Sequence, residues 1–130
     1  MRVYIVEDSP FMVERILSKL ESIHGVDVVG ISDEEEDALR KIRDRHPDFC
    51  IVDIRLKSGS GINLLEKIKI ERPETTVAIL TSYSIPEFFD KCMDLGADYF
   101  FDKAKDFDDI ENAVIKSKLG LEPSPYGIID

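Results

Sequence analysis

The sequence of 130 residues is 43% hydrophobic and 34% charged, which is typical of one globular domain. No apolar run approaches the roughly 20 residues that cross a bilayer, and the first residues lack the ordered parts of a secretory signal. We therefore expect a cytoplasmic protein that does not bind membranes. Acidic residues outnumber basic ones 27 to 17, and a net charge of −10 argues against direct binding to nucleic acid.

Five short apolar segments have the length of strands. In chain order they are Val3–Val6, Val26–Ile31, Phe49–Ile54, Val77–Leu80 and Tyr99–Phe101. The third and fourth segments are almost continuously apolar, which indicates strands that are covered on both faces.

The segments between these strands carry apolar residues at helical spacing. The stripes are Val13, Ile16, Leu17 and Leu20; Ala38, Leu39 and Ile42; Leu64, Leu65 and Ile68; and Ile110, Ala113 and Val114. Ser9 followed by Pro10 predicts the start of the first helix. The spacings of Ser32 with Glu35, and of Ser84 with Glu87, predict capping boxes.

Strands that alternate with helices predict one α/β domain of (βα)5 type, a doubly wound parallel sheet with helices on both faces. In such sheets the ligand site lies at the carboxyl ends of the strands. The acidic run at residues 33–37 is expected to be a solvated helix start. Cys50 and Cys92 lie in apolar segments and are expected to be reduced core thiols. With His24 and His46 they give no zinc-ligand spacing, and the histidines are expected at the surface or at helix ends.

Polar residues lie at the carboxyl ends of four of the predicted strands. They are Glu7 and Asp8; Asp53; Thr81 and Ser82; and Asp102 and Lys103. Each one alone is explained by a helix cap, a turn or a solvated surface. Because the carboxyl ends of parallel strands share one edge of the sheet, the whole set predicts a functional site there.

The charges of this set indicate its chemistry. Glu7, Asp8 and Asp53 repel one another, and Lys103 compensates only one of the three negative charges. A divalent cation would neutralise the remainder, and oxygen ligands suit Mg²⁺, or Mn²⁺ in its place. A carboxylate beside this ion, a lysine and the Thr81 hydroxyl is suited to accept a phosphoryl group.

At residues 2–119 the sequence resembles the receiver domain of two-component response regulators. The residues that carry the resemblance are Glu7, Asp8, Asp53, Gly61, Thr81, Gly96-Ala97-Asp98 and Lys103, in this order. The resemblance implies a flavodoxin-like strand order of 2-1-3-4-5. It also implies one receiver domain over residues 1–119, followed by a tail or linker at residues 120–130.

The resemblance further implies a role for each site residue. Asp53 would accept the phosphoryl group, Asp8 would bind the metal directly, and Glu7 would bind it through water. Arg55 would offer its backbone carbonyl to the metal, and Lys103 would pair with phosphoryl oxygens. The remaining pair, Thr81 and Phe100, would form the conformational switch.

Partners are implied as well. The phosphodonor would be a sensor histidine kinase or a histidine phosphotransfer protein. The output would pass through the surface of the fourth helix, fifth strand and fifth helix to a partner or output domain, with a phosphorylation-dependent homodimer as one form of response. Of Phe88 and Phe89, the less buried ring is the candidate that faces a partner.

Three positions depart from the family pattern. Glu7 stands where aspartate is more frequent, and Arg55 places a large cation beside the acceptor. Ala104 follows Lys103 where many members have proline, so we expect no cis peptide bond there.

Three other classes of protein share parts of this pattern. A phosphatase with an aspartate nucleophile needs a second aspartate two residues later, where this chain has Arg55, which cannot donate a proton near neutral pH. We therefore expect a phosphoacceptor that catalyses only its own phosphoryl transfer and slow dephosphorylation. A receiver-like interaction module independent of phosphate remains open. A flavin domain is disfavoured by the short acidic loop at residues 8–11.

Overall fold

The computed structural model describes residues 1–123, and the last part of the predicted tail, residues 124–130, lies outside them. Five strands form one sheet, β1 (Arg2–Val6), β2 (Asp27–Ser32), β3 (Phe49–Val52), β4 (Thr76–Thr81) and β5 (Tyr99–Asp102). All neighbouring pairs are parallel, and the order is β2-β1-β3-β4-β5. The predicted fold and strand order are confirmed.

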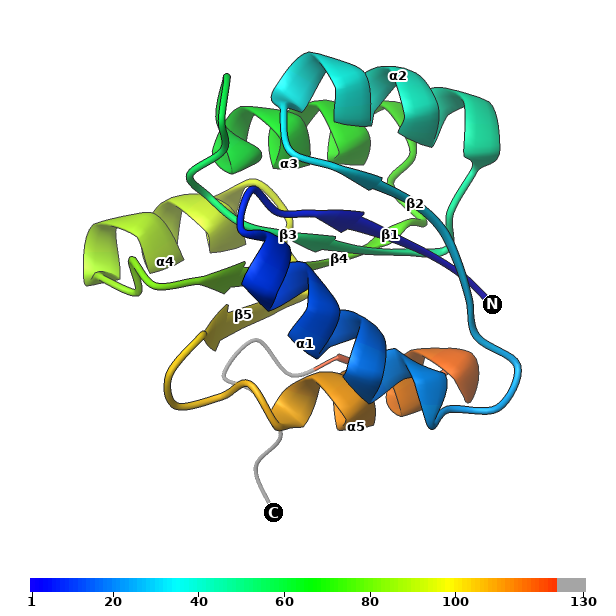
Figure 1. Ribbon diagram of the computed structural model, residues 1–130. Coiled ribbons are helices and arrows are strands. Elements are labelled where there is room, and N and C mark those ends of the chain that lie inside the picture. Colours follow the sequence, from blue (N-terminus) through cyan, green and yellow to red (C-terminus); the bar gives the residue numbers. More distant parts are fainter. Residues whose placement is uncertain (124–130) are drawn as a thin grey trace.

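Five helices cover the two faces of this sheet: α1 (Pro10–Glu21), α2 (Glu35–Arg45), α3 (Gly61–Glu71), α4 (Pro86–Asp94) and α5 (Asp109–Lys118). Figure 1 shows α1 and α5 on one face and α2, α3 and α4 on the other. Successive residues of a strand point to opposite faces, so Val3 and Ile5 join the core under α1 and α5. Tyr4 and Val6 join the core under α2, α3 and α4. This double coverage explains the nearly continuous apolar strands.

The predicted helix starts have mixed outcomes. Ser9 caps α1 as predicted, because its hydroxyl accepts a hydrogen bond from the Met12 N–H (3.3 Å) and Pro10 opens the helix. The two predicted capping boxes, at Ser32 and Ser84, are wrong. Ser32 ends β2, and its hydroxyl forms hydrogen bonds with the Tyr4 hydroxyl (2.5 Å) and the Asp37 carboxylate (2.6 Å) instead. Ser84 donates to Asp102 across the sheet edge, and α4 begins without a side-chain cap.

The start of α2 also differs from the prediction. Glu36 is exposed, but Glu35 is buried at 9% exposure, although the whole run was expected to be solvated. The reason is a set of partners in the β3–α3 loop and on α3.

The two cysteines and His46 lie where the sequence predicts them. Cys50 and Cys92 are buried free thiols, and burial raises the pKa of Cys50 to about 12 and that of Cys92 to about 11. His46 ends α2 in the left-handed region, at φ 50°. Within residues 1–123, no helix is both long and apolar enough to cross a membrane.

Candidate functional site

The site residues meet at one edge because of the strand register. Val6 of β1 pairs with Val52 of β3, so the residues that follow these strands lie side by side. The Asp53 N–H donates to the Val6 carbonyl at 2.9 Å and continues this alignment. On the other side of β3, Thr81 of β4 pairs with Asp102 of β5. The Lys103 N–H donates to the Thr81 carbonyl at 3.0 Å, which brings Lys103 to the same edge.

Three carboxylates form a cluster that could hold a metal ion. One oxygen from each of Glu7, Asp8 and Asp53 lies within 4.8 Å of the other two. Glu7 and Asp53 are buried, whereas Asp8 is exposed. An open, oxygen-only set of this kind fits a hard cation that keeps some of its waters, as Mg²⁺ does. These three carboxylates therefore fit the Mg²⁺ ion that the sequence predicts.

Lys103 connects two members of the cluster. Its Nζ lies 2.7 Å from Asp53 Oδ2 and 2.9 Å from Glu7 Oε1. The second oxygen of Asp53 accepts a hydrogen bond from the Ile54 N–H at 2.7 Å. When all groups are ionised, three carboxylates and one ammonium leave a formal charge of −2. A divalent cation would match that charge.

The ionisation of Glu7 and Lys103 reflects this crowding. Burial raises the pKa of Glu7 to about 7, the neighbouring charge of Asp53 adds to the rise, and hydrogen bonds from Lys103 and Ser9 oppose it. For Lys103, burial alone would lower the pKa, but the hydrogen bonds to Asp53 and Glu7 outweigh it and the pKa is raised. Lys103 is therefore cationic near neutral pH.

The two predicted switch residues lie on β4 and β5. Thr81 is fully buried, and its hydroxyl accepts a hydrogen bond from the Tyr83 N–H at 3.0 Å. Phe100 is 7% exposed. Its ring packs edge to face against that of Phe89, with 5.3 Å between the two ring centres. Phe100 belongs to the core under α2, α3 and α4, while Phe101 belongs to the opposite core. Phe88 and Phe89 are both half-buried, so exposure does not distinguish them.

Arg55 extends over a neighbouring loop. Its side chain is exposed, and its guanidinium carbon lies 4.2 Å from the centre of the Tyr83 ring. Such stacking of a cation on an aromatic face is favourable. Tyr83 is not among the site residues that the sequence predicts. A signal was present, because Arg55 and Tyr83 each stand two residues beyond a strand-end site residue, Asp53 and Thr81.

Asp102 and the loop after it complete the edge. One oxygen of Asp102 accepts hydrogen bonds from the Ala104 N–H (2.8 Å) and the Lys105 N–H (3.0 Å), and the other accepts from Ser84. No peptide bond among the described residues is cis, as expected from Ala104. Asp102 thus shapes the turn that presents Lys103.

A comparison with known families identifies the class of protein to which this site belongs. The family described as "Response regulator receiver domain" matches residues 3–115. The chain belongs to this family. It is a receiver domain, the phosphoacceptor signalling module of two-component response regulators.

Individual relatives agree. The chain is 30% identical to YvfU of Bacillus subtilis, described as an uncharacterized transcriptional regulatory protein, over 92% of this chain and 60% of that protein. The isolated receiver domain of RcsB from Salmonella enterica, solved with the phosphomimetic BeF₃⁻, matches with a TM-score of 0.86 and 26% identity, over 96% of this chain and 93% of that one. A structure of two RcsB dimers bound to two parallel DNAs matches with a TM-score of 0.86 and 25% identity, over 96% of this chain and 64% of that one. The chain thus spans less than two thirds of the length of YvfU.

Proposed function

We propose that Asp53 accepts a phosphoryl group and that this modification switches the domain between two signalling states. The observation that carries the proposal is the position of Lys103, 2.7 Å from Asp53 Oδ2 and 2.9 Å from Glu7 Oε1, inside the carboxylate cluster. A lysine held between the acceptor and a second carboxylate is placed to stabilise charge on a transferring phosphoryl group.

The chemistry follows from these groups. A carboxylate oxygen of Asp53 forms a bond to phosphorus, and the phosphorus–nitrogen bond of a phosphohistidine donor breaks, with the electron pair passing to the imidazole nitrogen. Lys103 pairs with the phosphoryl oxygens. Mg²⁺, or Mn²⁺, held by Asp8 and Asp53 directly, by Glu7 through water and by the Arg55 carbonyl, would supply neutralising charge. Slow attack by water on the acyl phosphate returns Asp53 and releases phosphate.

The conformational response begins at Thr81. Its hydroxyl exchanges the hydrogen bond from the Tyr83 N–H for one to the phosphoryl group. The β4–α4 loop then rearranges, and Phe100 repacks against Phe89. Phosphorylation acts by shifting the population between two conformations that both exist beforehand.

The output surface is the α4–β5–α5 face. A groove there is lined in part by Pro86, Phe89, Phe100 and Lys105. It reaches both the switch ring and the loop after β5, so repacking of Phe100 changes its shape. An output domain or target protein would bind this surface. The RcsB dimers show that a similar chain forms dimers, and we propose a homodimer that depends on phosphorylation as one response of this domain.

The proposal also covers the phosphodonor, the bounds of the domain, its cellular location and the question of turnover. The phosphodonor is a sensor histidine kinase or a histidine phosphotransfer protein, residues 1–119 form the receiver domain, and residues 120–130 are a tail or a linker. Buried free thiols at Cys50 and Cys92 support a cytoplasmic location. Arg55 occupies the position where a phosphatase would need its acid, so the domain is not a turnover enzyme.

Intact-protein mass spectrometry tests the proposal. Wild type incubated with a small phosphodonor and Mg²⁺ is expected to gain one phosphoryl group, and chelation of Mg²⁺ is expected to abolish the gain. Asp53→Asn is expected to gain none, and Glu66→Gln, an exposed change on α3, serves as the control. Wild type that is folded and takes no phosphoryl group would favour the phosphate-independent interaction module.

A further inference from the structure

The loop between β3 and α3, residues 53–60, carries both the acceptor and the carbonyl expected to bind the metal. Its start is fixed by Gly61, whose N–H donates to the Ile54 carbonyl at 2.8 Å. A Cβ on Gly61 would lie 1.9 Å from the Asp53 carbonyl oxygen, so the backbone of Gly61 rests directly on that of Asp53. Arg55 and Ser60 form an antiparallel bridge across the loop. The position of Ser60 therefore determines the position of the Arg55 backbone.

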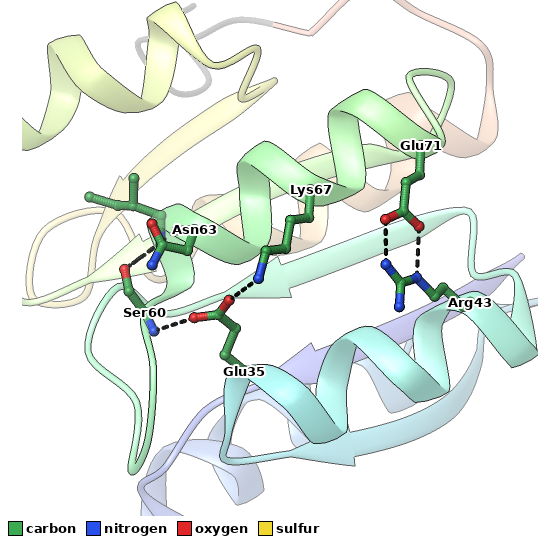
Figure 2. Close-up of polar contacts among 7 residues, drawn as sticks. Glu35, Arg43, Ser60, Asn63, Lys67 and Glu71 are labelled. Atoms are coloured by element: carbon green, nitrogen blue, oxygen red, sulfur yellow. Dashed lines mark hydrogen bonds and ion pairs between the residues drawn. The ribbon is translucent and has the colours of Figure 1, made fainter.

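One side chain outside the loop holds Ser60. Glu35, the first residue of α2, accepts a hydrogen bond from the Ser60 N–H with Oε1 at 2.9 Å. Its Oε2 lies 2.8 Å from Lys67 Nζ, on α3. Figure 2 shows the Glu35 carboxylate between Ser60 and Lys67. Glu35 is buried at 9% exposure, which is unusual for a glutamate.

The surrounding backbone fits around this carboxylate. The Glu35 N–H donates to the Ser58 carbonyl at 3.0 Å, and the Lys57 N–H donates to the Asp33 carbonyl at 2.9 Å. Gly59 adopts φ +80°, and a Cβ there would lie 2.5 Å from the Glu35 Cβ. The loop is therefore shaped to receive Glu35 in particular, and Ser60, once held, caps α3 by accepting from the Ile62 N–H at 3.0 Å.

A second ion pair joins the same two helices farther along. Arg43 of α2 donates to Glu71 of α3 with two hydrogen bonds, of 2.8 and 2.6 Å, which Figure 2 shows. On α2, Arg43 follows Glu35 by about two helical turns. This pair makes no contact with the β3–α3 loop in the hydrogen bonds and ion pairs of residues 1–123. The Arg43–Glu71 pair is therefore a matched control for the Glu35–Lys67 pair.

We propose that Glu35 is a positioning residue that holds the β3–α3 loop in the form in which the Arg55 carbonyl and Asp53 together receive the metal ion. The inference rests on the proposed function. Glu35 is not part of the carboxylate cluster of Glu7, Asp8 and Asp53, and it acts through Ser60 and the bridge from Ser60 to Arg55.

The test is the Mg²⁺ affinity of the unphosphorylated protein, measured by calorimetric titration. Glu35→Ala is expected to weaken Mg²⁺ binding by about tenfold, the lower end of the effect of residues that orient metal ligands. Glu35→Gln retains an acceptor for the Ser60 N–H and is expected to recover most of the affinity. Arg43→Gln, which breaks the control pair, is expected to leave the affinity within about twofold of wild type.

Stability and metal affinity must be separated. Thermal unfolding of each variant gives the stability, and the titrations are made where every variant is folded. Glu35→Ala that binds Mg²⁺ as tightly as Arg43→Gln would overturn the inference. If Glu35→Ala does not fold, Glu35→Met, which fills a similar volume but offers no acceptor to the Ser60 N–H, is expected to bind Mg²⁺ less tightly than Glu35→Gln, and equal affinities would overturn the inference as well. Wild type that binds no Mg²⁺ would instead overturn the proposed function.

Discussion

The ammonium of Lys103 lies 2.7 Å from a carboxylate oxygen of Asp53, and 50 residues of chain separate the two. The β3–β4–β5 ladders bring them together. The same ammonium also reaches Glu7 at 2.9 Å, so one cation supports two buried carboxylates. The acceptor site therefore depends on a charge balance, which substitutions can disturb in predictable directions.

Removing this cation is expected to destabilise the domain. Lys103→Met leaves Asp53 and Glu7 buried without their partner, and we expect a loss of about 1–3 kcal/mol in the free energy of unfolding. Urea unfolding in the absence of divalent cations measures it, and added Mg²⁺ is expected to restore part of the loss. Lys105→Met, at an exposed position on the same loop, is the control. A Lys103→Met domain as stable as this control would contradict the account.

The stack of Arg55 on Tyr83 is expected to lengthen the life of the acyl phosphate. The two residues join the loops that follow β3 and β4 at the edge where Asp53 and Thr81 lie. We expect the stack to persist when the β4–α4 loop rearranges and to limit the approach of water to the acyl phosphate. Arg55→Ala and Tyr83→Ala are each expected to shorten the lifetime severalfold. Because they break the same contact, the double variant is expected to lose little more than either single one.

The decay of the phosphoryl adduct after removal of the donor gives these lifetimes. Fully additive effects of the two substitutions would show that the residues act separately. A longer lifetime in either variant would show that the stack assists hydrolysis instead.

Gly61 is expected to tolerate no side chain. A Cβ would lie 1.9 Å from the Asp53 carbonyl oxygen, and that backbone is fixed by the sheet. Gly61→Ala is expected to cost about 3 kcal/mol or more, because α3 or the acceptor strand must shift. Gly120→Ala is the control, since that position has φ +71° but no atom within 4 Å of the added Cβ. Chemical denaturation of both variants compares a steric clash with backbone strain alone.

Glu35 also makes stability depend on pH in one direction. Burial by itself would raise the pKa of Glu35, but the hydrogen bonds from Lys67 and Ser60 outweigh it and the pKa lies below the ordinary 4.5. A depressed carboxyl pKa stabilises the folded state above the unfolded-state value and loses this effect as pH falls through the folded-state value. Wild type is therefore expected to lose more stability than Glu35→Gln as pH falls from about 6 to about 3.

Urea unfolding at several pH values measures this difference. The other acidic groups are common to both proteins, so their contributions cancel in the comparison. Parallel stability curves for wild type and Glu35→Gln would show that the carboxylate gains nothing from its hydrogen-bond partners.

The sequence predicts the parts of this structure that depend on local pattern. Periodicity places the strands and most helices, and the polar residues at strand ends identify the edge where Asp53 and Lys103 meet. The failures concern partners far away in the chain. Ser32 and Ser84 have the spacing of helix caps, but neighbouring strands offer them Tyr4 and Asp102, and these tertiary contacts prevail over the local motif.

The role of Glu35 was hidden for the same reason. It stands in an acidic run that local rules explain as a favourable first turn, and its burial depends on Ser60 and Lys67, which are 25 and 32 residues away. The contact of Tyr83 with Arg55 likewise forms only because the sheet brings their two loops together.

The central claim is that Asp53 carries the phosphoryl group, and reductive trapping tests it most directly. Borohydride reduces an aspartyl phosphate to homoserine, and peptide mass spectrometry then locates the altered residue. We predict homoserine at position 53 after incubation with phosphodonor and Mg²⁺, and unaltered aspartate there without donor. Homoserine at Asp8 or at any other position, with position 53 unchanged, would contradict the account.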